Sequence, residues 1–147
     1  MHSLKFIETT PYSGQPETDR VSGWTYVRVS PIAKGAVRRT VNIGTLNIDM
    51  ASDGTILGLE IENDPERRVE PVQLPHNWEH ALPVRLMLQG EVPDSSIQQA
   101  YDGDLQVLSL YLGEERGSTR TLRLSEQVVA LCTDKHIAAL HILGVDL

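Results

Sequence analysis

The chain has 147 residues, a net charge of −7 and only 5% aromatic residues. A chain of this length can bury a core of its own, and its single cysteine cannot form an internal disulfide. The acidic balance argues against a nucleic-acid binder, and no apolar run approaches the ~20 residues of a membrane helix. These features predict a soluble, cytoplasmic protein with no membrane partner.

The first part of the chain is predicted to be rich in strands. Residues 4–8 predict an edge strand, and the polar segment 9–23 predicts a loop. Four short segments rich in β-branched residues then predict strands. They are 24–30, 37–43, 46–50 and 56–62. Ser52-Asp53-Gly54 lies before the last of them and is a strong hairpin signal, because Asp-Gly readily adopts positive φ.

The middle of the chain, residues 67–104, is predicted to be an acidic connector. It contains a predicted strand at 84–88, and Asp94 is a helix-capping residue that predicts one or two helical turns up to Tyr101. Residues 65–104 hold seven acidic and three basic residues, so they carry −4 of the net charge of −7. A basic partner is therefore expected here, unless the charges only solvate a loop. The candidate binding residues are Glu66, Glu70, Glu79, Glu91, Asp94, Asp102 and Asp104.

The C-terminal part repeats the pattern of the first. A shift of 81 residues aligns Arg39–Ile61 with Arg120–Ile142 without a gap, and six of the 23 pairs are identical. This similarity predicts an internal duplication. The second copy has near-continuous apolar runs at 128–131 and 137–142, which predict strands buried on both faces at the junction of the two copies.

Together these patterns predict an all-β fold with at most one short helix. Two tandem antiparallel β units are expected to pack about a pseudo-twofold axis as a sandwich or a barrel-like sheet. The first unit, with its N-terminal extension, covers 1–66, the connector covers 67–104 and the second unit covers 105–147. We expect one compact domain overall.

The first unit also resembles a known family. Its strand and turn motifs are Tyr26-Val27-Arg28-Val29, Arg39-Thr40-Val41, Leu46-Asn47-Ile48-Asp49, Asp53-Gly54 and Gly58-Leu59-Glu60-Ile61. These resemble domain-of-unknown-function family 2283, a family of short bacterial and phage proteins, and the second unit looks like a degenerate copy. The resemblance implies a small β-sheet domain, and it brings no activity, cofactor or catalytic residue with it.

A possible metal site is the segment His76-Asn77-Trp78-Glu79-His80, which fits the H-x-x-E-H pattern of zinc proteases. On a helix, His76 and His80 would face one metal ion and Glu79 could act as the general base. Pro75 and Pro83 leave room for barely two helical turns, and no second helix supplies a third ligand. The alternative is a chance match at a helical corner with Trp78 packed on the sheet.

Three further groups of residues suggest chemistry, and each also has a structural interpretation. Cys132, Asp134, His136 and His141 suggest a metal or a nucleophile pair, but they align with hairpin positions of the first copy, Ala51, Asp53, Thr55 and Glu60. The carboxylates Asp49, Asp53, Glu60 and Glu62 surround one hairpin, where Asp49 approaching Glu60 or Glu62 would suit a hard cation. The arginines Arg38, Arg39, Arg116, Arg120 and Arg123 could form a basic stripe or structural ion pairs.

The leading hypothesis from the sequence is a non-enzymatic, small protein-interaction module without a cofactor. Its partner is expected to be another protein of basic character, and an antitoxin, immunity or phage-accessory role suits its size and acidity. The alternatives are a metal-dependent hydrolase built on His76, Glu79 and His80, and a small-ligand binder between the two units. Homodimer formation stays open.

Overall fold

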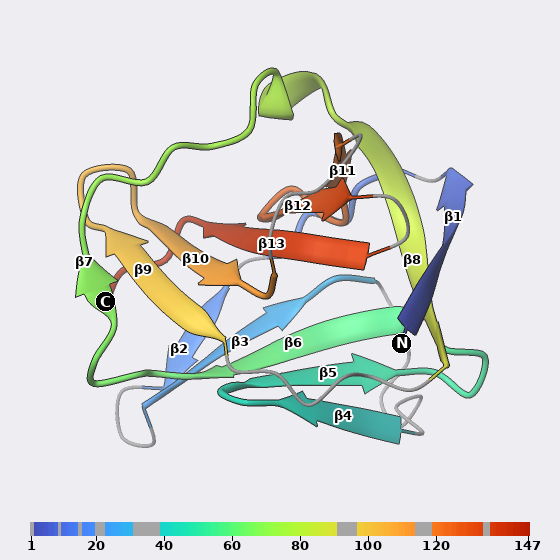
Figure 1. Cartoon of the computed structure of the whole chain (residues 1–147), viewed down its shortest axis with the longest axis horizontal. Coiled ribbons are helices and arrows are strands. Elements are labelled where there is room, and N and C mark those ends of the chain that lie inside the picture. The colour runs from blue at the N-terminus through green and yellow to red at the C-terminus, as the bar shows by residue number, and fades with distance from the viewer. Residues whose placement is uncertain are drawn as a thin grey trace.

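The alternating apolar residues of the chain build two β-sheets that pack face to face (Figure 1). The computed structural model describes residues 2–8, 10–14, 16–19, 23–30, 39–90, 97–113, 119–133 and 136–147. The all-β prediction is confirmed, and of the two predicted arrangements the sheets form the sandwich. No helix of the described residues is long and apolar enough to span a membrane.

The smaller sheet contains strands from the first part of the chain. Its order is β2 (Glu17–Asp19), β3 (Trp24–Arg28), β6 (Ile56–Glu62), β5 (Leu46–Met50) and β4 (Arg39–Ile43). The larger sheet has eight strands. Its order is β1 (His2–Glu8), β8 (Leu82–Gly90), β11 (Thr119–Arg123), β12 (Val128–Thr133), β13 (His136–Leu143), β10 (Val107–Tyr111), β9 (Gln98–Asp102) and β7 (Arg68–Val69).

The same arrangement of five strands occurs in both sheets. The order β2-β3-β6-β5-β4, here called the first unit, matches β9-β10-β13-β12-β11, here called the second unit, strand for strand. The hairpin β5–β6 has a bulge between Asp49 and Met50, and the hairpin β12–β13 has one between Leu131 and Cys132. The predicted copies thus use equivalent strands, while their common origin stays a prediction.

The strand registers correct the sequence alignment within the repeat. Arg39 lies opposite Met50, whereas Arg120 lies opposite Cys132, so Cys132 takes the place of Met50 rather than that of Ala51. The β4–β5 loop has two residues, and the corresponding β11–β12 loop has three. The extra residue shifts β12 by one position relative to β5 in the alignment. The shift of 81 residues would place Tyr26 on Val107. Tyr26 lies opposite Glu60, and Ser109 lies opposite His141, so Tyr26 corresponds to Ser109 instead.

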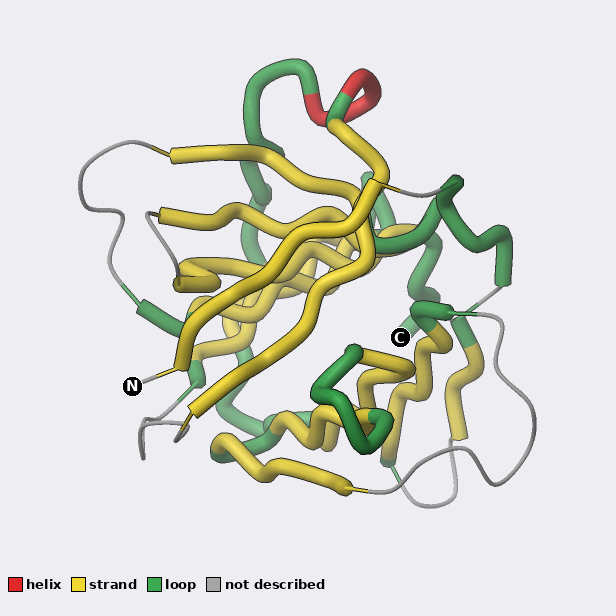
Figure 2. The backbone as a smooth tube through the Cα atoms, turned by 90° about the vertical axis from the view of Figure 1, so that its right-hand side faces the viewer, coloured by secondary structure: helices red, strands yellow, loops and turns green. Residues whose placement is uncertain are grey.

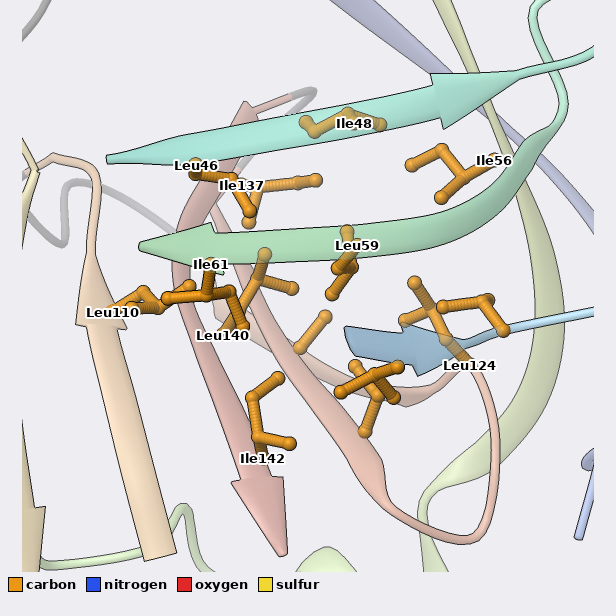
Figure 3. Packing of buried hydrophobic residues seen from close by; sticks show 14 of the residues in the cluster. Leu46, Ile48, Ile56, Leu59, Ile61, Leu110, Leu124, Ile137, Leu140 and Ile142 are labelled. Atoms are coloured by element: carbon orange, nitrogen blue, oxygen red, sulfur yellow. The ribbon is translucent and has the colours of Figure 1, made fainter. Parts of the chain in front are cut away.

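Apolar side chains from both sheets fill the space between the units (Figure 3). The fully buried side chains come from both units and from β8. The largest of them are Leu46, Ile48, Met50, Ile56, Leu59, Ile61, Leu86, Leu108, Leu110, Leu122, Leu140 and Ile142. Each large side chain buried in this way stabilises the fold by roughly 1.5–3 kcal/mol relative to exposure.

A buried amide also joins the units. Gln99 on β9 is 2% exposed, and its Nε2 donates to Thr45 Oγ1 at 2.9 Å and to the carbonyl oxygen of Glu62 at 2.7 Å. Its Oε1 accepts a hydrogen bond from the backbone N–H of Asp64 at 3.3 Å. Gln99 therefore ties the larger sheet to the end of β6.

Strand β8 bridges the two sheets at the other end. It pairs with β11 in parallel and with β1 in antiparallel orientation, and the N–H of Leu88 donates to the carbonyl oxygen of Gly54 at 2.8 Å. Gly54 has a φ of +91°, and a Cβ there would collide with the carbonyl oxygen of Leu88. The predicted Asp-Gly turn is thus also a contact point between the sheets.

Several local predictions have a clear outcome. The predicted edge strand at 4–8 lies within β1, and the predicted strand at 84–88 lies within β8. The helical turn predicted up to Tyr101 is wrong for residues 98–101, which form β9 and pair with β10. The sequence at Gln98–Tyr101 tolerates a helix, but strand pairing in the sheet overrides that local preference. The predicted loop 9–23 contains β2.

In the structure, the name connector is kept for the segment between β6 and β8, residues 63–81, because the rest of the predicted connector 67–104 includes β8 and β9. This segment contains a 3-10 helix, η1 (Trp78–His80), on the side of the molecule away from the five-stranded sheet (Figure 2). Asn77 precedes it with a φ of 56°, in the left-handed region. His76 and His80 are therefore not on a continuous α-helix, and the i, i+4 geometry of the proposed metal site does not form.

Candidate functional site

The two units expose very different outer faces to their surroundings. In the first unit the outward side chains are mostly polar and acidic, and we call this surface the acidic sheet face. It consists of Glu17, Trp24, Tyr26, Arg28, Thr40, Asn42, Asn47, Asp49, Glu60 and Glu62. Each of these residues is exposed or half-buried, because the neighbouring positions in each strand point into the core.

Two aromatic rings lie on the acidic sheet face. The rings of Trp24 and Tyr26, two residues apart on β3, are stacked with centroids 6.4 Å apart and an angle of 25° between their planes. Tyr26 is 36% exposed and lies opposite Glu60 on β6. An accessible aromatic surface beside a carboxylate is a suitable environment for a cationic side chain.

Next to the rings, two carboxyl groups from neighbouring strands approach each other. Burial, the charge of Asp49 and a hydrogen bond with the Asp49 side chain together raise the pKa of Glu60. The Asp49 carboxylate also accepts a hydrogen bond from Thr40 Oγ1 at 2.8 Å. Gly58 on β6 lies opposite Asp49, and a Cβ at Gly58 would lie only 3.2 Å from the carbonyl oxygen of Val27 and 3.8 Å from Asp49 Oδ2, so the backbone is closely packed here. The predicted approach of Asp49 to Glu60 is thus present.

The charge of this face is negative. Its carboxylates are Glu17, Asp49, Glu60 and Glu62, and the described side chains of the face include one cation, Arg28. Closely spaced like charges that are not neutralised by their own chain raise the free energy of the isolated surface. A cationic partner would lower it.

The equivalent face of the second unit is covered. Here the row Glu17, Tyr26, Glu60, Asn47 is replaced by Ala100, Ser109, His141, Val129, which are all between 0% and 2% exposed. Val72 and Leu74 of the connector pack against Ala100, Val107, Tyr111 and Leu143. The two-sided burial predicted for the second unit is confirmed, but the connector rather than the first unit covers its outer face.

Polar groups under the connector are paired within the protein. Ser109 Oγ and His141 Nδ1 are 2.7 Å apart, and burial lowers the pKa of His141 to about 4. The edge of the Tyr111 ring meets the His141 ring with centroids 6.2 Å apart. This serine–histidine pair has the composition of a nucleophile and a base, but both side chains are too deeply buried to meet a substrate in this structure.

The other members of the predicted Cys132 cluster do not gather around His141. Cys132 points into the core, and burial raises the pKa of its thiol to about 12, so it is an inert buried thiol. His141 points to the opposite face of the sheet. His136 begins β13, and Asp134 lies outside the described residues.

The carboxylates predicted to bind a partner have mixed roles. Asp102 is 7% exposed, and its carboxylate accepts hydrogen bonds from the backbone of Val72 at 2.9 Å, Asp104 at 3.0 Å and Leu105 at 3.1 Å. These bonds lower the pKa of Asp102 and anchor the connector, so the residue is structural. Glu66, Glu70, Glu79 and Asp104 lie at the surface, where Glu70 pairs with Arg68 at 3.4 Å, and Glu91 and Asp94 lie outside the described residues.

The proposed metal ligands are scattered along a short turn. His76, Glu79 and His80 are exposed, and the described part of the chain contains no group of three His, Cys, Asp or Glu side chains suited to a metal ion. Trp78 instead packs beneath the guanidinium of Arg123, with the Cζ atom 5.4 Å from the ring centroid. The metal-site hypothesis thus gains no geometric support from the described residues.

The remaining two groups of candidate residues are the turn aspartate Asp53 and the arginines of the predicted basic stripe. Asp53 accepts a hydrogen bond from the backbone N–H of Thr55 at 2.9 Å, and bonds from Thr55 lower its pKa, as in a turn-forming aspartate. Arg39 and Arg120 occupy equivalent exposed positions, and Arg123 donates to the carbonyl oxygen of Glu126 at 2.8 Å. Arg38 and Arg116 of the predicted stripe lie outside the described residues.

Comparisons with known proteins gave no relative. No family model matches the chain, and searches of curated proteins and of solved structures found no match either. The resemblance to domain-of-unknown-function family 2283 therefore stays a prediction.

Sequence reasoning missed the aromatic pair of the acidic sheet face. Its signal is the alternation along β3, where Thr25 and Val27 are buried while Trp24, Tyr26 and Arg28 lie on the other side. An aromatic row on the polar side of an amphipathic strand is the pattern that reveals such a surface.

Proposed function

We propose that this protein is a non-enzymatic interaction module that binds a basic protein partner through the acidic sheet face. The observation that carries this proposal is the contrast between the two outer faces. The connector covers one, and the other presents stacked Trp24 and Tyr26 rings among four carboxylates. The proposal moves the expected binding surface from the connector to the first unit.

The chemistry of the face favours a partner rich in arginine or lysine. A guanidinium can stack on Tyr26 while it hydrogen-bonds to the neighbouring carboxylates, and both contacts are stronger for arginine than for neutral side chains. Aromatic residues are also the side chains that most often dominate binding energy in protein interfaces. The proposed size of the interface is modest, as expected for one face of a five-stranded sheet.

The test is a pull-down of the tagged protein from a lysate of its source cells at two salt concentrations, read by mass spectrometry. We compare the wild type with a face variant, Tyr26→Ala with Glu60→Gln, and with a connector variant, Glu66→Gln with Glu79→Gln. The expected result is a basic partner that is released by salt, lost in the face variant and kept in the connector variant. Loss in the connector variant alone would overturn the proposal.

The other hypotheses have no specific observation in their favour. The described interior between the units is filled by core side chains, and the described residues form no three-ligand metal group. A small-ligand binder and a metal-dependent hydrolase therefore stay predictions. An antitoxin, immunity or phage-accessory role remains compatible with the proposed binding activity, and the identity of the captured partner would decide among these roles.

A further inference from the structure

The outer edge of the second unit is occupied by an additional strand. β11 pairs with β12 on one side and with β8 in parallel on the other, where Leu122 lies opposite Leu82 and Arg123 lies opposite Pro83. β4 takes the place of β11 in the first unit. Within the described residues, β4 pairs with β5 and with no strand on its other side.

The outer edge of β4, which has no strand beside it among the described residues, has backbone groups that can pair with an added strand. Ile43 and Leu46 close the two-residue loop of the β4–β5 hairpin, so Ile43, Val41 and Arg39 exchange their backbone hydrogen bonds with β5. The N–H and C=O groups of Thr40 and Asn42 consequently point toward the outer edge of β4. The second unit has the same pattern, because the N–H of Leu124, which takes the place of Ile43, donates to the carbonyl oxygen of Val128 at 3.0 Å.

We infer that the edge of β4 binds an extended segment of the partner protein as an additional parallel strand, as β8 does at β11. This inference rests on the proposed function for the basic character of that segment. The Thr40 hydroxyl already contacts the Asp49 carboxylate on the acidic sheet face. Alternate side chains of an added strand would lie beside Thr40 and Asn42 on that face, so arginine or lysine at alternate positions would complement it.

The experiment uses the full ¹⁵N-labelled chain and a synthetic peptide of five Arg-Val repeats, blocked at both ends. At saturation, hydrogen exchange at the amides of Thr40 and Asn42 should slow at least tenfold, because both groups become hydrogen-bonded. A spin label at the N-terminus of the peptide should broaden the signal of Arg39 more than that of Ile43, as a parallel orientation requires.

Two variants separate edge pairing from general attraction. Thr40→Pro removes the outward N–H, and it should weaken peptide binding about five- to tenfold, since a lost hydrogen bond in this setting costs about 1–1.5 kcal/mol. Thr40→Val keeps that N–H and loses only the side-chain hydroxyl, so it should bind the peptide about fivefold or more tighter than Thr40→Pro. Amide exchange in the wild type decides the question alone if Thr40→Pro does not fold.

The outcomes distinguish this inference from the proposed function. Binding of the peptide without protection of the Thr40 and Asn42 amides, or no binding at millimolar concentration, would overturn strand addition. Protection of both amides with equal affinity in the Tyr26→Ala, Glu60→Gln variant would support strand addition and count against the sheet face as the main binding surface. Broadening strongest at Ile43 would overturn the parallel orientation.

Discussion

The outer faces of the two units share one framework of strands and differ in nearly every side chain. At corresponding positions, the first unit has Glu60 and Tyr26, and the second has His141 and Ser109. The first pair is exposed or half-buried, whereas the second is 0–2% exposed. The same strand arrangement therefore forms a solvent-exposed surface in the first unit and a buried layer in the second.

The connector accounts for this difference. Asp102 holds the backbone of Val72 in place, so that Val72 and Leu74 seal the second face, and charges are absent from the positions they cover. Burying an unpaired carboxylate there would cost several kcal/mol. An open face carries no such penalty, so the carboxylates of the first unit persist only where water or a partner can solvate them.

The largest change in stability is expected when the residues at the corresponding positions 60 and 141 are exchanged. His141→Glu places a carboxylate beneath the connector, and we expect it to lower the free energy of unfolding by about 4 kcal/mol or to prevent folding. Glu60→His at the open position should change stability by less than about 1 kcal/mol. Urea denaturation of both variants at pH 7 measures the difference. Equal losses would show that both faces are buried to the same extent.

The same comparison predicts a dependence of stability on pH. His141 has a pKa of about 4 in the folded protein and about 6.5 when unfolded, so the unfolded chain binds more protons between these values. Stability should therefore fall as the pH drops from 6.5 toward 4, by about 2 kcal/mol already at pH 5. Thermal or urea unfolding between pH 7 and pH 5 measures this slope.

His141→Gln should flatten that slope, because it removes the titrating group. His80→Gln, on the exposed connector turn, serves as the matched control and should leave the slope unchanged. An unchanged slope in His141→Gln would contradict the buried, neutral state of this histidine.

Two valines of the connector test how strongly it seals the second face. Val72 is 7% exposed and packs on that face, whereas Val69 is 77% exposed on β7. Val72→Ala should cost about 1–2 kcal/mol, since it removes two buried methyl groups, and Val69→Ala should cost less than about 0.5 kcal/mol. Urea denaturation of both variants measures the two costs, and equal costs would contradict the covering role of the connector.

Much of the architecture follows from sequence patterns, since alternation and β-branched residues predict the strands and the similarity of 39–61 to 120–142 predicts equivalent hairpins. The offset of Cys132 was not predictable in the same way, because a loop longer by one residue moves a strand without disturbing its apolar pattern. The strand at Gln98–Asp102 was also missed, because helix-tolerant residues there are held by pairing with a distant segment.

The candidate site was predicted only in part, for a related reason. The approach of Asp49 to Glu60 follows from hairpin spacing, and the structure contains it. The distribution of charge along the sequence pointed instead to the middle of the chain. A count of charges does not show that the Asp102 carboxylate is occupied by backbone hydrogen bonds, nor that the connector lies over the second unit. Which face stays open depends on tertiary packing of a segment with little periodicity of its own.

The smallest effect concerns the carboxyl pair of the open face. The pKa of Glu60 is raised in the folded protein, so its ionised form opposes folding at neutral pH, and this opposition disappears as the pH falls and the group is protonated. Glu60→Gln should therefore stabilise the protein at pH 7 by about 0.5 kcal/mol, a value reduced by solvent screening, and by almost nothing at pH 4. Glu62→Gln removes the same charge one row further along β6 and is the matched control. If both variants stabilise the protein equally, the lower net charge rather than the contact with Asp49 is responsible. If only Glu60→Gln stabilises it, the repulsion between Glu60 and Asp49 raises the free energy of the open face locally, and a cationic partner can remove this repulsion.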